Sequence, residues 1–541
     1  MENELPIFRK AVYIVLLFVA VVIVYGHFLQ NPIVFDDIEF FIQPLKNHLG
    51  FHPLEVRWLP YFTIAWTAHG IGLNVMWFRL EGLFLHAATG IAMFVFLQRL
   101  FELTLKEGDN NPARLPHIWV AFFGALIFVW HPVSVYAAAY LIERTIVMAT
   151  LFSLLALYAY IRGVTENSPR WLWGSVCLYG LAVFSKEHAV MLPAVMLALT
   201  LLLEKTSVAL WKRLWPMFVA CTLIALFVTV QKLGLLGTIY EVEAPEMLGK
   251  IKVDNPYPLS VLTQSYLFFK YWLLWLFPDP AWMSVDMREP FARSFFSPYL
   301  LALLAFVGYG VVAFKLLIKR AEVGLLGFGL LFPWLLFATE FATVRIQESF
   351  VLYRSYLWMA GIFAALPFLL KYVRAKWAFV GLSVCVLVLA MLAVNRLTTF
   401  ANPFLLWDDA AVLVRDKQDL PGVSRIYYNR GKSLTDLGRF PEALADYQRA
   451  VSLAPNDVAN RYALGVGYMN VARYADAIAE FNKTIEMNPK HVQARLGRGL
   501  SYLELGNKAA ALVDLDASCK LGFKIACVKM KMLDGKNNPS N

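Results

Sequence analysis

Two adjacent carboxylates follow the first long hydrophobic run of the chain, and their position suggests chemistry. Asp36 and Asp37 come soon after residues 11–29, which contain no Asp, Glu, Lys or Arg. As a helix this run is about 28 Å long, enough to cross a bilayer core. Arg9 and Lys10 precede it, which predicts a cytoplasmic N-terminus and an external acidic pair. Such a pair suits activation of a nucleophile, binding of a cation or movement of a proton.

Further ionisable side chains are predicted near the same membrane face. Carboxylates and cations at one depth suit a reaction in which a carboxylate activates a nucleophile while cations hold a phosphate leaving group. Taken one at a time, each group could equally lie in water at the end of a helix. The residues are Glu39, Arg57, His69, His131, Glu143, Arg144, Lys186, Glu187, His188, Arg345, Glu348 and Arg354.

The composition indicates a polytopic membrane protein with a soluble appendix. Of the 541 residues, 59% are hydrophobic and only 16% are charged, with a mean hydropathy of +0.56. The net charge of +10 comes from Lys and Arg on loops between hydrophobic runs. The positive-inside rule explains that distribution, and it argues against nucleic acid as a partner.

The hydrophobic runs predict an all-α membrane domain over residues 1–396, with external loops at 30–77 and 233–297. Residues 259–277 are also hydrophobic, but a full crossing there would invert the sidedness of the later basic loops. We therefore predict a re-entrant or interfacial helix in this segment and an external C-terminal tail. The roughly eleven crossings are expected at 11–29, 78–99, 118–133, 143–162, 171–186, 189–204, 212–232, 298–318, 323–339, 355–370 and 377–395.

The tail contains an internal repeat. Gly431, Gly465 and Gly499 are spaced by 34 residues, and three alanine positions keep the same spacing. Small residues where helices cross and a Pro at repeat boundaries resemble the tetratricopeptide repeat. We expect residues 424–541 to form an α-solenoid of three repeats. Residues 397–423 are expected to form a linker and a capping helix at about 404–418, whose acidic pair is a solvated helix start.

Two cysteines of the tail, Cys519 and Cys527, are separated by seven residues. In an oxidising compartment they could form a disulfide that closes a helix-turn-helix, and their spacing resembles that of Sel1-like repeats. The alternative is a pair of unpaired buried thiols.

Several longer segments carry a family resemblance. They are HPVSVYAAAYLIERTIVMATLFSLLALYAY from His131, FSKEHAVMLPAVMLAL from Phe184, VLYRSYLWMAGI from Val351, and LLWDDAA before the repeats. In this order they resemble bacterial relatives of the transmembrane and tetratricopeptide-repeat-containing family of GT-C glycosyltransferases. The resemblance implies an enzyme that moves a sugar from a polyprenyl-phosphate carrier to an acceptor on the extracytoplasmic face.

The resemblance also implies roles for single residues. Asp36 or Asp37 would deprotonate or position the acceptor hydroxyl, and the pair could share a divalent metal ion, which two carboxylates alone leave undecided. Lys186 and Arg354 would hold the carrier phosphate together with Arg144. Five further residues are expected to lie around the substrate: Glu143, His131, Glu187, His188 and Arg57.

Three positions depart from the family pattern, and His131 has two interpretations. Tyr136 stands where a Glu is often found, and Thr145 and Ile146 replace a Lys-Asp pair. His131 would act on the substrate or would only shape the turn of a His-Pro helix end.

The sequence therefore predicts a bacterial inner-membrane glycosyltransferase with a periplasmic active site. Its partners would be a polyprenyl-phosphate-linked sugar, membrane lipids and a protein bound by the repeats. One alternative is a non-catalytic scaffold for envelope or pilus assembly. Another is a flippase for the same carrier, which the one-sided charges and the lack of an inverted repeat make less favourable.

Overall fold

The computed structural model describes residues 7–42, 45–105, 114–231, 237–239, 241, 244–251, 253, 255–417 and 420–533. Among these residues every regular element is a helix, and the one isolated β-bridge joins Met287 to Phe350. The prediction of an all-α fold is confirmed. The chain divides into two compact units, Met1–Asn402 and Pro403–Asn541. Each unit is described by itself.

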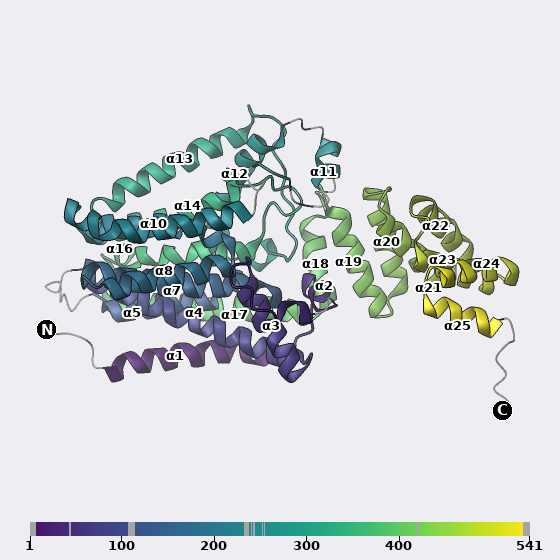
Figure 1. Ribbon diagram of the computed structural model, residues 1–541, viewed down its shortest axis with the longest axis horizontal. Helices are drawn as coiled ribbons and strands as arrows, with labels where there is room; N and C mark the ends of the chain where they lie inside the picture. Colours follow the sequence, from purple (N-terminus) through teal and green to yellow (C-terminus); the bar gives the residue numbers. More distant parts are fainter. Residues whose placement is uncertain are drawn as a thin grey trace. The chain divides into compact units, whose positions relative to one another are not determined.

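The first unit is a bundle of long helices that run side by side, with α2 and α3 at one end (Figure 1). The long helices are α1 (Ile7–Tyr25), α4 (Val75–Thr104), α5 (His117–Trp130), α7 (Arg144–Thr165), α8 (Pro169–Ser185), α9 (Leu192–Leu203), α10 (Val208–Gln231), α12 (Pro256–Leu276), α13 (Pro298–Leu317), α14 (Ala321–Phe337) and α17 (Ala375–Phe400). The other helices are α2 (Asp36–Ile42), α3 (Trp58–Ile71), α6 (Pro132–Ala138), α11 (Ala244–Ile251), α15 (Ser355–Trp358) and α16 (Leu366–Leu369). Short 3-10 segments η3 (Leu141–Glu143), η4 (Glu187–Met191), η6 (Ala338–Phe341), η7 (Leu352–Arg354) and η8 (Met359–Ala365) join them at the bends.

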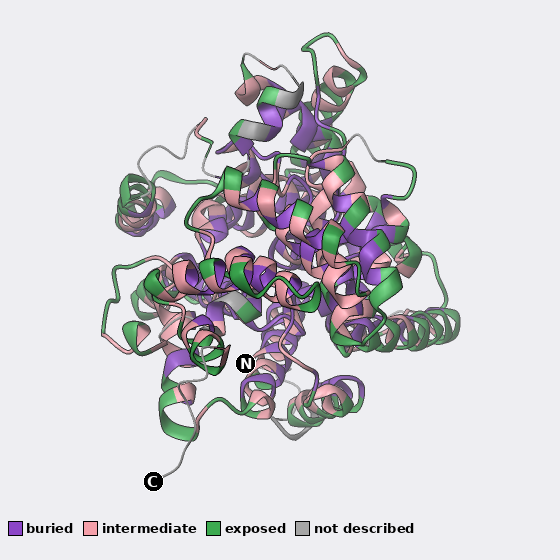
Figure 2. Cartoon of the chain, turned by 90° about the vertical axis from the view of Figure 1, so that its right-hand side faces the viewer, coloured by how far each residue is buried: buried purple, intermediate pink, exposed green. Residues whose placement is uncertain are grey.

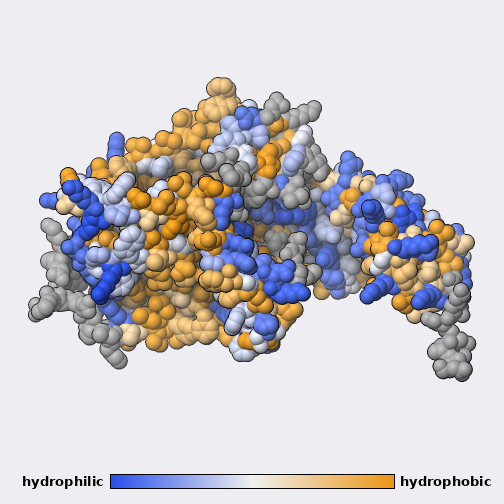
Figure 3. Space-filling view, viewed as in Figure 1, coloured by the Kyte–Doolittle hydropathy of each residue, from blue (hydrophilic) through white to orange (hydrophobic). Residues whose placement is uncertain are grey.

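The outer surface of this bundle is apolar. Large hydrophobic side chains are exposed on several long helices, among them Ile23 on α1, Leu301 on α13 and Met391 on α17. They form a broad hydrophobic surface between more polar ends (Figure 3). Exposure of so large an apolar surface to water is energetically unfavourable, whereas the hydrocarbon chains of a bilayer can cover it without this penalty. The first unit is therefore a membrane domain.

Helices occur at all of the predicted crossings, but they differ in length. Within the described residues, eight helices are long and apolar enough to cross a membrane, or nine if α5 and α6 form one broken span. That pair bends by 64° at His131–Pro132, because proline cannot donate a hydrogen bond and forces the residue before it into an extended conformation. α8 has 17 residues, and the apolar helix Glu187–Leu203 is also shorter than the others. The total of eleven crossings stays a prediction.

The hydrophobic run at 259–277 forms α12, which is 21 residues long and packs against α13. Many of its side chains are buried within the unit, including Tyr271 and Trp275. Among the described helices it is not one of those apolar enough to count as a candidate span. Its expected re-entrant or interfacial position stays a prediction.

The second unit is a solenoid of paired helices. It consists of α18 (Pro403–Leu413), α19 (Val423–Asp436), α20 (Phe440–Leu453), α21 (Val458–Asn470), α22 (Tyr474–Met487), α23 (Val492–Glu504), α24 (Lys508–Lys520) and α25 (Lys524–Leu533). Buried and exposed residues alternate around these helices, as in amphipathic helices packed side by side (Figure 2). The 34-residue period therefore predicted the helix pairs correctly.

The repeated glycines allow the helices of each pair to approach closely. A Cβ atom at Gly431 would lie 2.8 Å from the Tyr447 ring, and one at Gly465 would lie 2.6 Å from the Phe481 ring. Only a residue without a side chain fits at these crossings. The capping helix, α18, packs against α19 as expected but ends at Leu413. Asp408 is not merely solvated, because its Oδ1 lies 2.8 Å from Arg430 Nη1.

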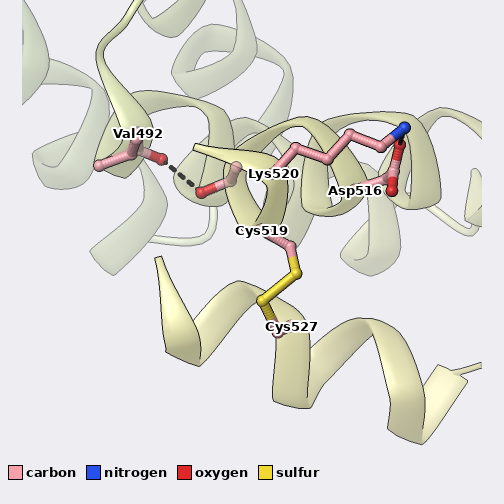
Figure 4. The surroundings of a disulfide bond; sticks show 6 residues. Val492, Asp516, Cys519, Lys520 and Cys527 are labelled. Carbon is pink, nitrogen blue, oxygen red and sulfur yellow. Dashed lines mark hydrogen bonds and ion pairs between the residues drawn. A yellow bond between two sulfur atoms is a disulfide. The ribbon is translucent and has the colours of Figure 1, made fainter. Parts of the chain in front are cut away.

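A disulfide joins Cys519 of α24 to Cys527 of α25 (Figure 4). The bond closes the helical turn between these elements, and Ala526 beside it is buried. Structural disulfides persist outside the reducing cytosol. Whether this disulfide forms in cells therefore indicates on which side of the membrane the solenoid lies.

We expect the tail thiols to be oxidised in cells. In a Cys177→Ser/Cys221→Ser/Cys385→Ser variant, only Cys519 and Cys527 remain of the five cysteines. A maleimide added to denatured whole-cell protein should label no thiol before reduction and both thiols after it, as read by gel shift. Labelling of both thiols without a reductant would contradict an external tail.

Candidate functional site

The segment before the acidic pair is held by the buried Arg79. Its Nε donates to the Asn31 carbonyl oxygen (2.7 Å), its Nη2 to that of Pro32 (2.5 Å) and its Nη1 to that of Ala139 (2.8 Å). A guanidinium has five donors in one plane and can gather several carbonyls at once. Arg79 of α4 thus ties the loop after α1 to the end of α6.

Asp37 is fully buried and faces the same region. The backbone N–H groups of Leu141 and Ile142 donate to its Oδ2 (3.0 Å) and Oδ1 (2.7 Å). Because both carboxylate oxygens accept these bonds, Asp37 fixes η3, which ends at Glu143. This geometry gives Asp37 a positioning role. The side chain of Asp36 lies outside the described residues.

The residue before the pair has an unusual backbone conformation. Phe35 has a φ of 55°, a left-handed value that is costly for a side chain of this size. Its ring lies 5.9 Å from that of Tyr140, between centroids. The acidic pair is therefore presented by a strained turn packed against the loop that leads to Glu143.

Lys186 and Glu143 form a buried ion pair at the centre of the site. Lys186 Nζ lies 2.5 Å from Glu143 Oε2 and 3.2 Å from Thr145 Oγ1, which also donates to that carboxylate. Nζ also lies 4.8 Å from the centroid of the Tyr353 ring, a cation–π distance. Thr145, one of the departures from the family pattern, therefore supplies a hydroxyl to this ion pair.

Arg57 and Glu187 form a second, more exposed pair. Two bonds join the guanidinium to the carboxylate, at 3.1 and 2.5 Å, and both side chains are partly exposed. The Arg57 backbone N–H also donates to the Phe184 carbonyl, which joins the start of α3 to the end of α8. The nearby Glu187 carboxylate raises the pKa of Arg57, so the guanidinium stays charged.

Arg144, the residue after η3, bonds to two neighbouring helices. Its Nη1 lies 2.8 Å from Glu81 Oε2 and 3.1 Å from Thr63 Oγ1, and its Nη2 donates to the Phe78 carbonyl. These partners belong to α3 and α4. Arg144 is thus held between helices, and this gives less support to contact with a donor phosphate.

Glu340 was not predicted as a site residue, yet it lies among three predicted groups. Its Oε1 is 3.0 Å from His188 Nε2, and its Oε2 is 3.3 Å from Arg345 Nε and 3.2 Å from Arg354 Nη1. Its side chain is almost fully buried. The sequence could have indicated Glu340 as a site residue, because a carboxylate at the end of a hydrophobic run is energetically costly unless it has a partner.

The loop after Glu340 is ordered by a second carboxylate that sequence reasoning missed. Glu241 accepts backbone N–H groups from Ile346 (2.9 Å), Gln347 (2.6 Å) and Glu348 (3.1 Å). Glu348 in turn pairs with Arg354 Nη2 at 3.3 Å. Glu241, from the segment between α10 and α11, therefore supports the loop that carries Glu348.

His131 lies apart from these ion pairs and shapes the bend between α5 and α6. Its Nδ1 accepts from the Val133 N–H (3.2 Å), which leaves Nε2 to donate to the Trp275 carbonyl (3.1 Å). Its ring stacks on Trp275 at 4.2 Å between centroids and is buried. These contacts favour the interpretation of His131 as a turn-shaping residue.

An apolar cavity of about 950 Å³ reaches from α12 along α14 and α17. Trp275 forms part of its wall and donates from Nε1 to Ser355 Oγ (2.9 Å), next to Arg354 in the chain. This bond joins the cavity wall to the residue that follows Arg354. Other lining residues are Trp272, Leu276, Trp282, Leu330, Ile362, Val388 and Leu392.

No metal site is evident in the described part of the chain, where no three His, Cys, Asp or Glu side chains gather as ligands. Both oxygens of Asp37 already accept N–H bonds, which does not favour it as a ligand.

Family models match two parts of the chain. Residues 113–231 match the model of dolichyl-phosphate-mannose-protein mannosyltransferases, and residues 424–457 and 462–519 match tetratricopeptide-repeat models. The first match contains His131, Glu143, Arg144, Lys186, Glu187 and His188. The chain thus joins a mannosyltransferase-like membrane segment to tetratricopeptide repeats, which are protein-interaction modules.

Solved structures resemble the chain weakly. YrrB, a TPR protein with an unusual peptide-binding site, is 23% identical, with 31% of this chain and 89% of that chain covered and a TM-score of 0.23. The APC/C hetero-tetramer Cut9-Hcn1 is 16% identical, with 88% and 89% covered and a TM-score of 0.23. Scores this low do not establish a shared fold. The comparison with curated proteins gives no match.

Proposed function

We propose that this chain is a membrane-embedded glycosyltransferase of the GT-C kind. It transfers a sugar from a polyprenyl-phosphate carrier to an acceptor hydroxyl, and its repeats bind a protein partner or the acceptor itself. In a bacterium it would lie in the inner membrane, with the N-terminus in the cytoplasm and the site and repeats in the periplasm. The proposal is supported by two buried ion pairs, Lys186–Glu143 and Arg354–Glu340, which we call the cationic cluster. The ring of Tyr353, the residue before Arg354, lies 4.8 Å from Lys186 Nζ, and Ser355, the residue after Arg354, bonds to the cavity residue Trp275.

The cations of this cluster suit a phosphate leaving group. Lys186 and Arg354 are buried, and each is paired with a carboxylate, Glu143 or Glu340. The carboxylates keep the cations charged and oriented before the donor binds. A donor phosphate that approaches the cluster exchanges with these partners and meets two preoriented positive groups. The Tyr353 ring, 4.8 Å from Lys186 Nζ, bounds the space on the side of Lys186.

The two aspartates of the acidic pair have different roles. Asp37 positions η3 through its two N–H bonds, so we assign the role of base to Asp36. The acceptor O–H gives its proton to the carboxylate, and the acceptor oxygen forms a bond to the anomeric carbon. The bond from that carbon to the phosphate oxygen breaks, and its electron pair leaves with polyprenyl phosphate.

The lipid tail of the carrier has a place in the apolar cavity. A Val388→Trp substitution narrows the cavity from α17, where this side chain is 48% exposed and leaves room for the ring. We expect the KM for the lipid-linked donor to rise by about tenfold, with a smaller change in kcat. Leu387→Trp is the matched control, because Leu387 is the preceding residue and does not line the cavity. An equal effect of both substitutions would contradict this placement.

The function is tested in cells by intact-mass analysis of surface and periplasmic proteins. A deletion strain should lose a sugar-sized mass from an acceptor, which the wild-type gene restores and an Asp36→Asn variant does not. Restoration by Asp36→Asn would contradict a catalytic acidic pair and favour the scaffold alternative. An unchanged protein profile after deletion would contradict a protein acceptor.

A further inference from the structure

The last helix of the solenoid exposes an apolar stripe. Ile525, Val528 and Met532 are 57%, 51% and 64% exposed, and their spacing places them on one side of α25. Leu521, in the turn before the helix, is 47% exposed. The end of a repeat array ordinarily carries a polar outer face. A partner is therefore expected to cover this stripe.

Lysine is the predominant charged residue type around the stripe, with Asp516 and Asp534 at the two ends of the segment. Residues 517–533 contain four lysines and no Asp or Glu. Lys520, Lys524, Lys529 and Lys531 are all exposed. Lys520 is paired with Asp516 of α24 at 2.6 Å (Figure 4). The combination of an apolar stripe with flanking lysines is complementary to an anionic surface with an apolar layer beneath it.

The disulfide fixes which face of α25 points outward. Cys519–Cys527 and the buried Ala526 hold one side of the helix against α24. One 34-residue period earlier, the equivalent positions at α23 are His491, Ala494 and Arg498, none of which is a large apolar residue or exposed. The stripe is therefore a property of α25 and not of the repeat.

We propose that α25 docks on the surface of an anionic membrane. Its 10 residues are too short to cross a bilayer, but a basic amphipathic helix of this kind lies in the headgroup region with its apolar side down. The lysines meet lipid phosphates, and Ile525, Val528 and Met532 reach the acyl boundary. The solenoid follows a membrane helix, α17, in the same chain, so a bilayer is always present at a high effective concentration.

Hydrogen exchange of the full chain in lipid nanodiscs tests this inference. In nanodiscs that contain phosphatidylglycerol, the amides of α25 should exchange at least about tenfold more slowly than in phosphatidylcholine nanodiscs. A Lys524→Gln/Lys529→Gln/Lys531→Gln variant should lose this difference. Lys432→Gln/Lys490→Gln/Lys508→Gln is the matched control, since these exposed lysines lie elsewhere on the solenoid.

An Ile525→Ser/Val528→Ser/Met532→Ser variant should lose the protection too, with formation of the disulfide as the check that α25 is still packed. Equal exchange in the two nanodiscs would overturn the inference. So would protection that persists in the triple-glutamine variant. Protection that appears in phosphatidylcholine nanodiscs only after an acidic peptide is added would replace the membrane with a protein partner.

Discussion

Replacement of Arg354 by alanine is expected to lower kcat/KM for sugar transfer by about 10²- to 10³-fold, the effect of removing one preoriented group that stabilises developing charge. The guanidinium is buried, and it bonds to Glu340 at 3.2 Å and to the Glu348 carbonyl at 3.1 Å. Arg354→Lys should recover only part of the activity, because an ammonium group cannot make the planar two-point contact with a phosphate. Turnover of a lipid-linked sugar by purified protein measures both.

Arg345→Ala is the matched control for this experiment. Arg345 contacts the same carboxylate, Glu340, at 3.3 Å, but it has no assigned role at the phosphate. Loss of either arginine leaves Glu340 with the other arginine and with His188, so Glu340 keeps two partners in both variants. A similar loss of activity in the two variants would show a structural effect and contradict phosphate binding by Arg354.

Replacement of Asp36 and replacement of Asp37 are expected to have different effects on activity and stability. Asp36→Asn should reduce kcat by about 10²- to 10⁴-fold, the usual contribution of a general base, without a change in thermal stability. Asp37→Asn should destabilise the fold by about 1.5–3 kcal/mol, because two N–H bonds to a buried charged acceptor are weakened. Activity assays and thermal unfolding of the same preparations separate the two effects.

A Glu39→Gln variant in the same short helix, α2, serves as the control, since Glu39 has no assigned role. If Asp37→Asn kept its stability and lost activity as Asp36→Asn does, Asp37 would share the chemistry and its positioning role would be wrong. If Asp36→Asn remained active, the pair would not supply the base.

The features that the sequence predicted well depend on local pattern. The solenoid follows from a 34-residue period, in which Gly431 and Gly465 repeat because each crossing excludes a side chain. Hydropathy likewise located every long helix. Hydropathy could not show the 64° bend at His131, because an average over a window of residues contains no information about the direction of the helix axis. Only the following proline, Pro132, indicated a break in the helix.

The contacts that assemble the site were beyond the reach of sequence reasoning. Glu340 meets His188 across more than 150 residues, and Glu241 binds the backbone at 346–348. Neither pairing leaves a periodic signal, since it depends on the tertiary placement of bends and loops. The predicted cations Lys186 and Arg354 stood out because charges near membrane spans are costly and need a reason.

Transfer by the purified chain in nanodiscs tests the central claim most directly. The protein is given a polyprenyl-phosphate-linked radiolabelled sugar and an extract of candidate acceptors, and free polyprenyl phosphate and labelled acceptor are measured together. The account predicts that both appear in equal amounts with the wild type and that both fall with Arg354→Ala but not with Arg345→Ala. If the wild type formed neither product from any lipid-linked sugar that the source cell makes, this result would contradict the assignment as a glycosyltransferase.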